Sequence, residues 1–290
     1  MTYALAIGQR SYSSWSLRGW LLFEKTGLPL QLQFAEIYGA DFLKQLAEFA
    51  PARTVPALRL PDGTAVTESL AIAEELASRH PEAGLWPEDP SARAMARSMA
   101  AEMHAGFTAL RGDCPQNLRV SYAGFRPAAG VLADLARLER LWALARDRFG
   151  SAGPWLFGAW SAADAFFAPV AGRIASYGLP VGPEAQAYVD LQLADPAFRR
   201  WRALGAVEGP DIPRYHLPLA ARPWPGPKPL PARAVAGTEA ENTACPYSGR
   251  PVTHVLEFRG RRWGFCNPTC RDMTLQDPEA WPSFMAMAGG

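Results

Sequence analysis

The N-terminal part of the chain alternates between short apolar runs and stretches with helical periodicity. Residues 3–7 form an apolar run, and Leu17, Trp20 and Leu21 open a helical pattern that extends to residue 26. Leucine and phenylalanine then alternate with glutamine over residues 30–34, which is the two-residue period of a strand. These segments predict a β-α-β unit.

The pattern after this unit continues the same domain. A polar helix is expected over residues 41–49, and residues 54–58 lead into a short strand. A turn over residues 61–64 precedes a return strand at 65–67, and helical periodicity then runs from 68 to 80. The predicted order of elements is therefore β-α-β-α-β-β-α.

A proline-containing stretch over residues 81–90 is expected to join this domain to one that is helical throughout. Apolar stripes over residues 95–110 and 131–145 predict two helices, and a polar loop over 111–119 lies between them. We expect the methionines of the first stripe to lie in the core.

Two further helical signals complete this second domain. Residues 161–164 form a capping box that opens a helix with apolar residues nearly all round, which should lie at the centre of the domain. Pro169 is expected to bend this helix. Helical signals continue over residues 185–204, after which prolines interrupt the pattern.

Composition and charge narrow the functional classes. The chain has 290 residues, 49% of them hydrophobic, and this is enough for about two domains with cores. A formal net charge of +1 gives no electrostatic footprint for nucleic acid or for an acidic membrane. The N-terminal apolar run is too short for a membrane span or a secretory signal, so we expect a cytoplasmic protein. Cys114 stands alone, and the cysteines do not form a disulfide framework.

Ser13 and Ser14 lie where the first helix is expected to begin. A serine hydroxyl beside a helix N-terminus can hydrogen-bond an anion while the helix dipole favours the negative charge, which suits a thiolate at neutral pH. The alternative is that one of these serines only caps the helix.

Three motifs at matching spacing give the N-terminal region a strong resemblance to the thioredoxin-like domain of glutathione transferases. They are the serines of the first helix, Val55-Pro56 before the third strand, and Glu68-Ser69 at the start of the third helix. The resemblance implies that a cis peptide bond before Pro56 frees the Val55 backbone to pair with the cysteinyl part of glutathione. It also implies that Glu68 and Ser69 bind the γ-glutamyl end, and it extends to about residue 216.

Among transferase classes, the run Ser-Ser-Trp-Ser-Leu-Arg is most similar to the zeta class, which carries Ser-Ser-Cys-Ser followed shortly by arginine. This match puts the activating hydroxyl on Ser13, with Ser14 as its neighbour. Trp15 replaces the cysteine of that class, which argues against isomerase chemistry of the maleylacetoacetate type. Gln116 and Asn117 resemble a zeta-class segment that faces glutathione, so we expect them in the site, and Arg111 and His104 are further candidates.

The last part of the chain predicts a tether and a separate small module. Residues 217–234 are rich in proline and are expected to form an extended linker. In residues 235–290, Cys245 begins a run similar to a zinc knuckle, in which Ser248 stands in place of the second cysteine. A hairpin is predicted to follow, with its turn at Arg259-Gly260, and Cys266 and Cys270 come after it. The spacing resembles YHS and TRASH-type metal-binding modules, so we expect a treble-clef-like α+β fold.

Zinc normally takes four ligands at a structural site, and the sequence offers three thiols. The hairpin register pairs His254 with Phe265, which places His254 on the apolar face away from Cys266. Water, Ser248 or another chain could supply the fourth ligand, or the module could keep its fold without a metal.

The domain boundaries that follow are 1–82, 90–216, 217–234 and 235–290. Two functions remain open. One is a glutathione transferase that conjugates or isomerises a small electrophile. The other is a protein that binds glutathione for sensing and handles metal through its tail. The family resemblance also implies a homodimer formed by the transferase part, and we expect no nucleic-acid or membrane partner.

Overall fold

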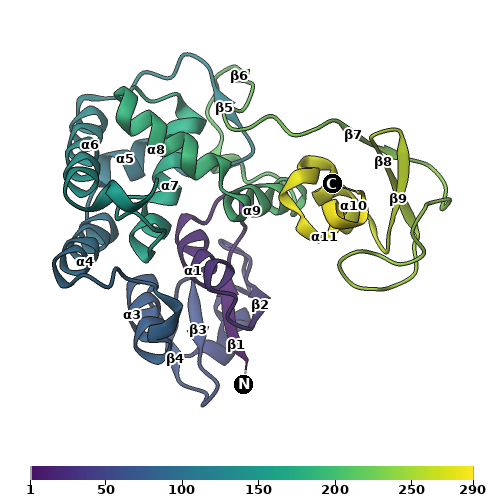
Figure 1. Cartoon of the computed structure of the whole chain (residues 1–290), viewed down its shortest axis with the longest axis horizontal. Helices are drawn as coiled ribbons and strands as arrows, with labels where there is room; N and C mark the ends of the chain where they lie inside the picture. The colour runs from purple at the N-terminus through teal and green to yellow at the C-terminus, as the bar shows by residue number, and fades with distance from the viewer. Residues whose placement is uncertain (1, 290) are drawn as a thin grey trace.

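The structure, a computed structural model, describes residues 2–289. Figure 1 shows a larger body, which contains the N-terminal sheet and a group of helices, and a smaller module at the C-terminal end of the chain beside α9. None of the described helices is both long and apolar enough to cross a bilayer.

The N-terminal domain is a four-stranded sheet with helices packed on it. Its strands have the order β2-β1-β3-β4; β1 and β2 are parallel and the other neighbours are antiparallel. Its elements are β1 (Tyr3–Ile7), α1 (Ser14–Thr26), β2 (Leu30–Phe34), α2 (Phe42–Gln45), β3 (Ala57–Arg59), β4 (Ala65–Val66) and α3 (Ser69–Arg79). This order confirms the predicted β-α-β-α-β-β-α sequence.

The helix expected over residues 41–49 is the exception in this domain. The structure has only four α-helical residues there, followed by a 3-10 turn over Ala47–Phe49. Leu46 and Phe49 are buried in a small cluster with Ala4, Ala6 and other side chains of the sheet. The buried apolar side chains therefore hold this segment against the sheet, although it does not form a regular helix.

The second domain is helical, as predicted, apart from the two-residue strand β5 (Ser121–Tyr122). Its helices are α4 (Pro90–Ala105), α5 (Thr108–Asp113), α6 (Ala129–Phe149), α7 (Ala162–Tyr177), α8 (Pro183–Ala194) and α9 (Pro196–Val207). The stripe over residues 95–110 is divided between two helices, because the chain breaks at Gly106 and Phe107 adopts a left-handed φ of 55°. The expected loop over 111–119 therefore starts inside α5.

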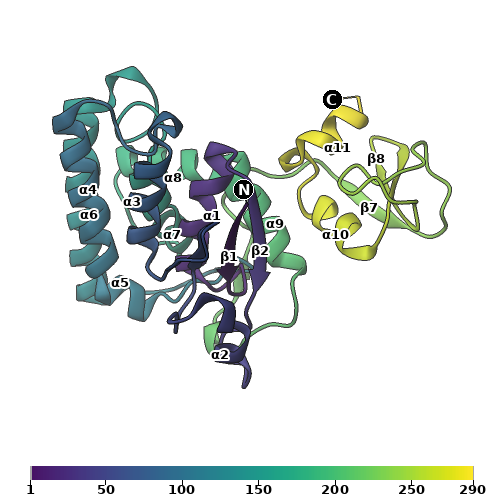
Figure 2. The same cartoon turned by 90° about the horizontal axis from the view of Figure 1, so that it is seen from below.

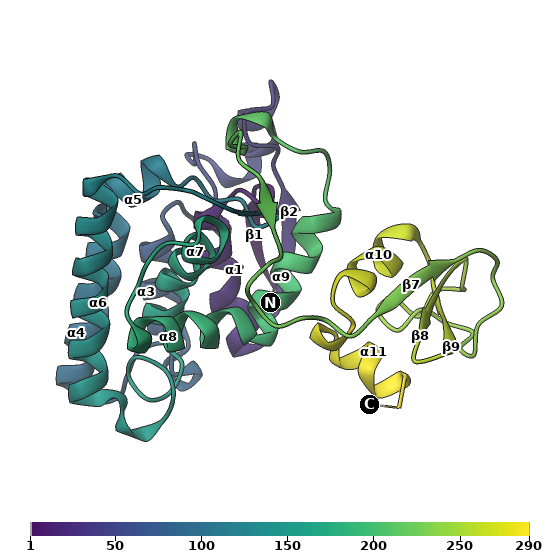
Figure 3. The same cartoon turned by 90° about the horizontal axis from the view of Figure 1, so that it is seen from above.

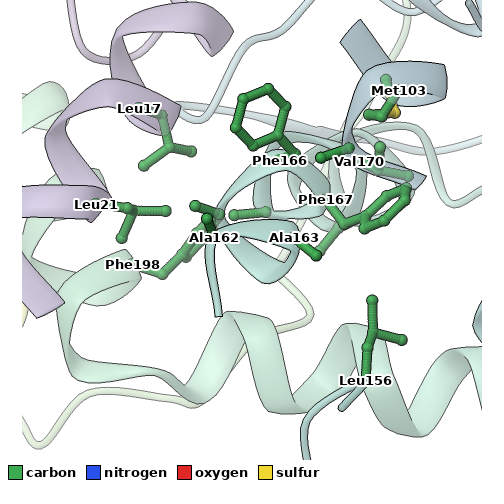
Figure 4. Packing of buried hydrophobic residues seen from close by; sticks show 14 of the residues in the cluster. Leu17, Leu21, Met103, Leu156, Ala162, Ala163, Phe166, Phe167, Val170 and Phe198 are labelled. Carbon is green, nitrogen blue, oxygen red and sulfur yellow. The ribbon is translucent and has the colours of Figure 1, made fainter. Parts of the chain in front are cut away.

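Helix α7 forms the centre of the body. Every one of its residues is buried, and Ser161 and Asp164 form the predicted capping box. Figure 4 shows Phe166 and Phe167 of α7 between Leu17 of α1 and Met103 of α4. Burial raises the pKa of Asp164 to about 6, against the opposing hydrogen bonds from Ser161, Tyr188 and Leu156.

The proline-rich segment does not form a free tether. Strand β6 (Ala221–Arg222) pairs with β5 (Ser121–Tyr122) of the body, and β7 (Ala232–Val235) already belongs to the sheet of the tail. Between them, Trp224 packs against the core of the body, and the guanidinium of Arg202 lies 4.2 Å from its ring centroid. The prolines therefore interrupt regular structure without keeping the segment away from the body.

The tail has its own sheet and its own core. The strands β7, β8 (His254–Phe258) and β9 (Arg261–Phe265) are followed by α10 (Pro268–Gln276) and α11 (Pro282–Met287). His254 pairs with Phe265 and Leu256 pairs with Trp263, which is the register predicted from the turn at Arg259-Gly260. Phe258, Phe265 and Phe284 are among the buried residues of the tail core.

Helix α9 joins this core to the body, which corrects the expectation of two mechanically separate units. Ala203 of α9 is buried in the tail core, and Leu204 and Val207 pack against it. Arg199 makes a bidentate ion pair with Asp277, with N–O distances of 2.8 and 2.7 Å. Figures 2 and 3 show α10 and α11 on the side of the body where α9 lies.

Candidate functional site

A cavity of about 1110 Å³ lies between the N-terminal and helical domains. Its wall is formed by the start of α1, the loop after β2, the segments before β3 and α3, and residues of α4, α5 and α7. The lining residues are Tyr12, Ser13, Ser14, Trp15, Ile37, Tyr38, Gly39, Ala40, Phe42, Leu43, Arg53, Thr54, Val55, Pro56, Thr67, Glu68, His104, Thr108, Arg111, Gly112, Pro115, Gln116, Arg173 and Tyr215.

Both predicted serines line this cavity, but they have different neighbours. Ser13 is the N-cap of α1: its Oγ accepts a hydrogen bond from the Ser16 amide and lies 2.7 Å from Ser16 Oγ. Ser14 Oγ accepts a longer hydrogen bond, 3.4 Å, from Nη2 of Arg173. The capping role considered for Ser13 is therefore present, and Ser14 is the serine next to a buried cation.

The two motifs expected to bind glutathione flank the same cavity. The peptide bond between Val55 and Pro56 is cis, and both residues line the wall. Glu68 is the N-cap residue of α3, and its carboxylate lies 3.7 Å from Nε2 of His104. The next residue, Ser69, is buried, and its hydroxyl has no hydrogen-bond partner among the described residues.

Gln116 and Asn117 are adjacent in sequence but differ in their availability. Gln116 lines the cavity, is only 2% exposed, and neither end of its amide has a partner among the described residues. Asn117 is fully buried away from the cavity wall: its amide donates to the Tyr215 carbonyl and accepts from the Arg119 amide. The structure therefore places Gln116 in the cavity wall and Asn117 outside it, where its side chain links the Tyr215 carbonyl to the Arg119 amide.

Two buried arginines, Arg173 and Arg18, bring positive charge to this region, and the sequence pattern did not predict them as part of the site. Arg173 donates to the Cys114 carbonyl at 2.9 Å and lines the cavity, and burial lowers its pKa to about 10. Arg18 is buried behind the wall, and its Nε and Nη1 have no partner among the described residues. The position of Arg173 within the mostly apolar pattern of α7 is a sequence feature that could have indicated it.

Trp15 lines the cavity and packs against Arg18 and Arg111. The guanidinium carbons of Arg18 and Arg111 are 4.3 and 4.8 Å from its ring centroid, and the ring of His104 meets it edge-on at 5.0 Å. Such contacts stabilise a cation that has been removed from water. Trp15, which stands where the zeta class has a cysteine, is therefore packed among positively charged side chains at the cavity wall.

Residues 208–216, which we call the strap, pass beside the cavity and contribute Tyr215 to its wall. The ring of Tyr215 in the strap packs against Tyr12 in a tilted arrangement with centroids 4.9 Å apart, and its hydroxyl lies 2.8 Å from the hydroxyl of Tyr38. Asp211 accepts a hydrogen bond from Tyr12 at 3.1 Å. The strap thus connects the end of α9 to the loop after β2 across the cavity.

Cys114 takes no part in this wall. It is fully buried, and burial raises the pKa of its thiol to about 12. A thiol in such surroundings is unreactive at neutral pH.

The tail brings its three cysteines together. The sulfurs of Cys245, Cys266 and Cys270 all lie within 4.8 Å of one another. Ser248 Oγ donates a hydrogen bond to Cys266 Sγ at 3.2 Å, whereas Nδ1 of His254 lies 2.9 Å from Thr253 Oγ1. His254 is not part of the described cluster, which agrees with the face predicted from the hairpin register.

Residues 12–79 match the family profile described as glutathione S-transferase, N-terminal domain. The larger part of the chain has the glutathione S-transferase fold. A glutathione transferase from Methylococcus capsulatus superposes with a TM-score of 0.52 at 26% identity, covering 71% of this chain and all of that one. A homologue from Burkholderia gl BGR1 with bound glutathione gives 0.53 at 24% identity, covering 71% of this chain and 98% of the other.

Two relatives by sequence have names from the class that the serine motif resembles. A probable maleylacetoacetate isomerase of Caenorhabditis elegans is 33% identical over 136 residues, which cover 47% of this chain and 61% of that protein. A maleylacetoacetate isomerase of Mus musculus is 31% identical over 112 residues, or 38% of this chain and 49% of the mouse protein. The matches thus span about half to three fifths of the relatives' length. They support the expected resemblance to glutathione transferases.

Proposed function

We propose that this chain is a glutathione-dependent enzyme that activates the thiol of glutathione with Ser13 or Ser14. The observation that carries the proposal is the cavity in which these serines meet the cis Val55-Pro56 peptide bond and the unpartnered amide of Gln116. The unpartnered hydroxyl of Ser69 at the start of α3 would hydrogen-bond the γ-glutamyl carboxylate, and the N-terminal end of that helix favours the same charge.

The electrophile that fits the rest of the cavity carries a carboxylate. Glu68 is the one acidic residue among the described lining residues, and its carboxylate faces His104. Arg173 and Arg111 line the opposite domain and have no carboxylate partner within the described part of the chain. A bound carboxylate would provide the missing counter-charge in surroundings of low polarity, where such pairs are strong.

Conjugation and isomerisation share the first step at this site. The thiolate of glutathione forms a C–S bond with the electrophilic carbon, while the serine hydroxyl donates a hydrogen bond to the sulfur until the bond forms. In conjugation the adduct leaves after protonation or loss of a leaving group. In isomerisation the C–S bond breaks again and releases the thiolate. The relatives named maleylacetoacetate isomerases keep the second outcome open, although Trp15 replaces the zeta-class cysteine.

Single substitutions of the two serines test this function. Losing one charge-assisted hydrogen bond to a thiolate costs about 1.5–3 kcal/mol, so we expect turnover to fall roughly ten- to a hundredfold in the responsible variant. Ser13→Ala also removes the cap of α1, so turnover should be compared with thermal stability and with the ultraviolet absorbance of bound glutathione thiolate. Full turnover and full thiolate absorbance in both Ser13→Ala and Ser14→Ala would exclude the proposed mechanism.

Two further proposals concern assembly and the tail. The resemblance to glutathione transferases supports a homodimer formed by the transferase part, and light scattering on the whole chain tests it; a monodisperse monomer at micromolar concentration would reject it. The cluster of Cys245, Cys266 and Cys270 supports a second function, which is binding of one zinc ion by the tail. Zinc near one per chain that is lost in the double variant Cys266→Ser, Cys270→Ser is the expected result.

A further inference from the structure

The turn that carries Cys245 is built so that Ser248 faces the other two cysteines. The Gly249 amide donates to the Cys245 carbonyl at 2.9 Å, and the Cys245 amide donates to the Arg250 carbonyl at the same distance. Gly249 has a φ of 68°, which a side chain would disfavour. This closed turn holds residues 245 and 248 on the side where α10 begins.

Ser248 lies beside the thiol cluster. Its hydroxyl is 3.2 Å from Cys266 Sγ and accepts a hydrogen bond from the Arg250 amide. Cys266 also receives a hydrogen bond of 3.3 Å from the Asn267 side chain, and Asn267 in turn caps the helix at Cys270. The three thiols are thus positioned by the helix start and the turn, and the oxygen of Ser248 contacts Cys266 directly.

The exposure of the four residues is graded. Cys245 is buried, Cys266 and Cys270 are half-buried, and Ser248 is exposed. The three sulfurs therefore form the inner side of the cluster, and the hydroxyl lies between them and the solvent. An alcohol oxygen is a weaker ligand for zinc than a thiolate, and a site with three strong protein ligands keeps its fourth position exchangeable.

We propose that Ser248 makes this a three-sulfur, one-oxygen site whose fourth position is open to exchange, instead of a closed four-thiolate structural site. This inference rests on the proposed zinc function of the tail. Ser248 either contacts the ion directly or holds a water that does, and in both arrangements it positions the oxygen. The ligand class is a divalent ion of borderline softness, such as Zn²⁺ or the spectroscopic probe Co²⁺.

The test compares wild type with Ser248→Ala, Ser248→Cys and the control Ser283→Ala, which changes an exposed serine of α11 outside the cluster. Each full-length protein is reduced, freed of metal and titrated with Co²⁺ without oxygen, followed by competition with Zn²⁺. We expect Ser248→Ala to bind both ions about tenfold more weakly, because loss of a supporting oxygen typically costs ten- to a hundredfold in metal affinity. Ser283→Ala should match wild type.

Ser248→Cys supplies the decisive comparison. A fourth thiolate should tighten Zn²⁺ binding by about tenfold or more and raise the intensity of the sulfur-to-cobalt charge-transfer band by about one third, since four thiolates replace three. Ser248→Ala with wild-type affinity and spectrum, or Ser248→Cys without these gains, overturns the role of Ser248 while leaving the zinc function in place. If neither wild type nor Ser248→Cys binds either ion, both the zinc function and this inference are wrong.

Discussion

The transferase cavity and the tail cluster each begin at a helix N-terminus, and each departs from the pattern it resembles at one cysteine. In the cavity the replacement is Trp15, whose ring is contacted by Arg18, Arg111 and His104. In the tail it is Ser248, whose hydroxyl still points to Cys266. The first replacement fills space and stabilises charge, whereas the second keeps an oxygen atom next to the thiols. A missing cysteine therefore has a different meaning in the two regions, and the neighbours of its replacement decide which.

The largest expected effect comes from removing the tail from the body. A chain that ends after His216 would expose Ala203, Leu204 and Val207 of α9 and lose Trp224 from the body. Each large apolar side chain returned to water costs about 1.5–3 kcal/mol, so we expect a markedly lower melting temperature or aggregation. Thermal unfolding of the truncated and full-length chains measures this.

The matched control for the truncation is Arg199→Ala, which removes the ion pairs from α9 to Asp277 and Glu279 but keeps the tail. It should lower the melting temperature less than the truncation does. If the truncated chain has the same melting temperature as the full-length protein, the contacts between the tail and α9 do not stabilise the body.

The next effect concerns the charge of the cavity. Arg173→Met removes the cation beside Ser14, and we expect kcat/KM for a carboxylate-bearing electrophile to fall about tenfold to a hundredfold, equivalent to one charged hydrogen bond. A neutral electrophile should be affected much less. Arg53→Met, at an exposed position of the same wall, is the control and should change both substrates alike. Equal losses with both electrophiles in Arg173→Met would show that Arg173 only maintains the fold.

The smallest effect separates the roles of Trp15. Trp15→Leu keeps an apolar side chain but removes the aromatic face beside Arg18 and Arg111, so we expect about 1–2 kcal/mol less free energy of unfolding. Trp15→Phe retains an aromatic ring and should lose less than half of that amount. Denaturant unfolding of both variants measures the difference. Equal stabilities would mean that the ring contributes by its volume alone.

The order of elements and several local features could be predicted because they depend on short-range pattern. The β-α-β start, the capping box at Ser161 and the hairpin register at His254 all follow from residues within a few positions of one another. The serines of α1 reached the cavity for the same reason.

Contacts between distant segments could not be predicted in this way. Arg18 and Arg173 lie within apolar helical patterns, and only tertiary packing shows that their charges meet near one wall. The proline content of residues 217–234 predicted an extended linker, but it carried no information about the strands β6 and β7 or about the packing of Trp224. Asn117 was expected in the site from a resemblance of its segment, and nothing in the sequence indicated that its side chain bonds to the carbonyl of Tyr215, 98 positions away.

The strap also sets the order in which this protein can acquire its site during synthesis. The amide of Arg10, just before the serines, donates to the carboxylate of Glu208, and these partners are 198 positions apart in the chain. Ribosomes add about 5–20 residues per second, so the first helix is made roughly 10–40 s before the strap emerges. The cavity wall at Tyr215 is therefore completed late, and a nascent chain that already contains the serines cannot yet hold a ligand in an enclosed site.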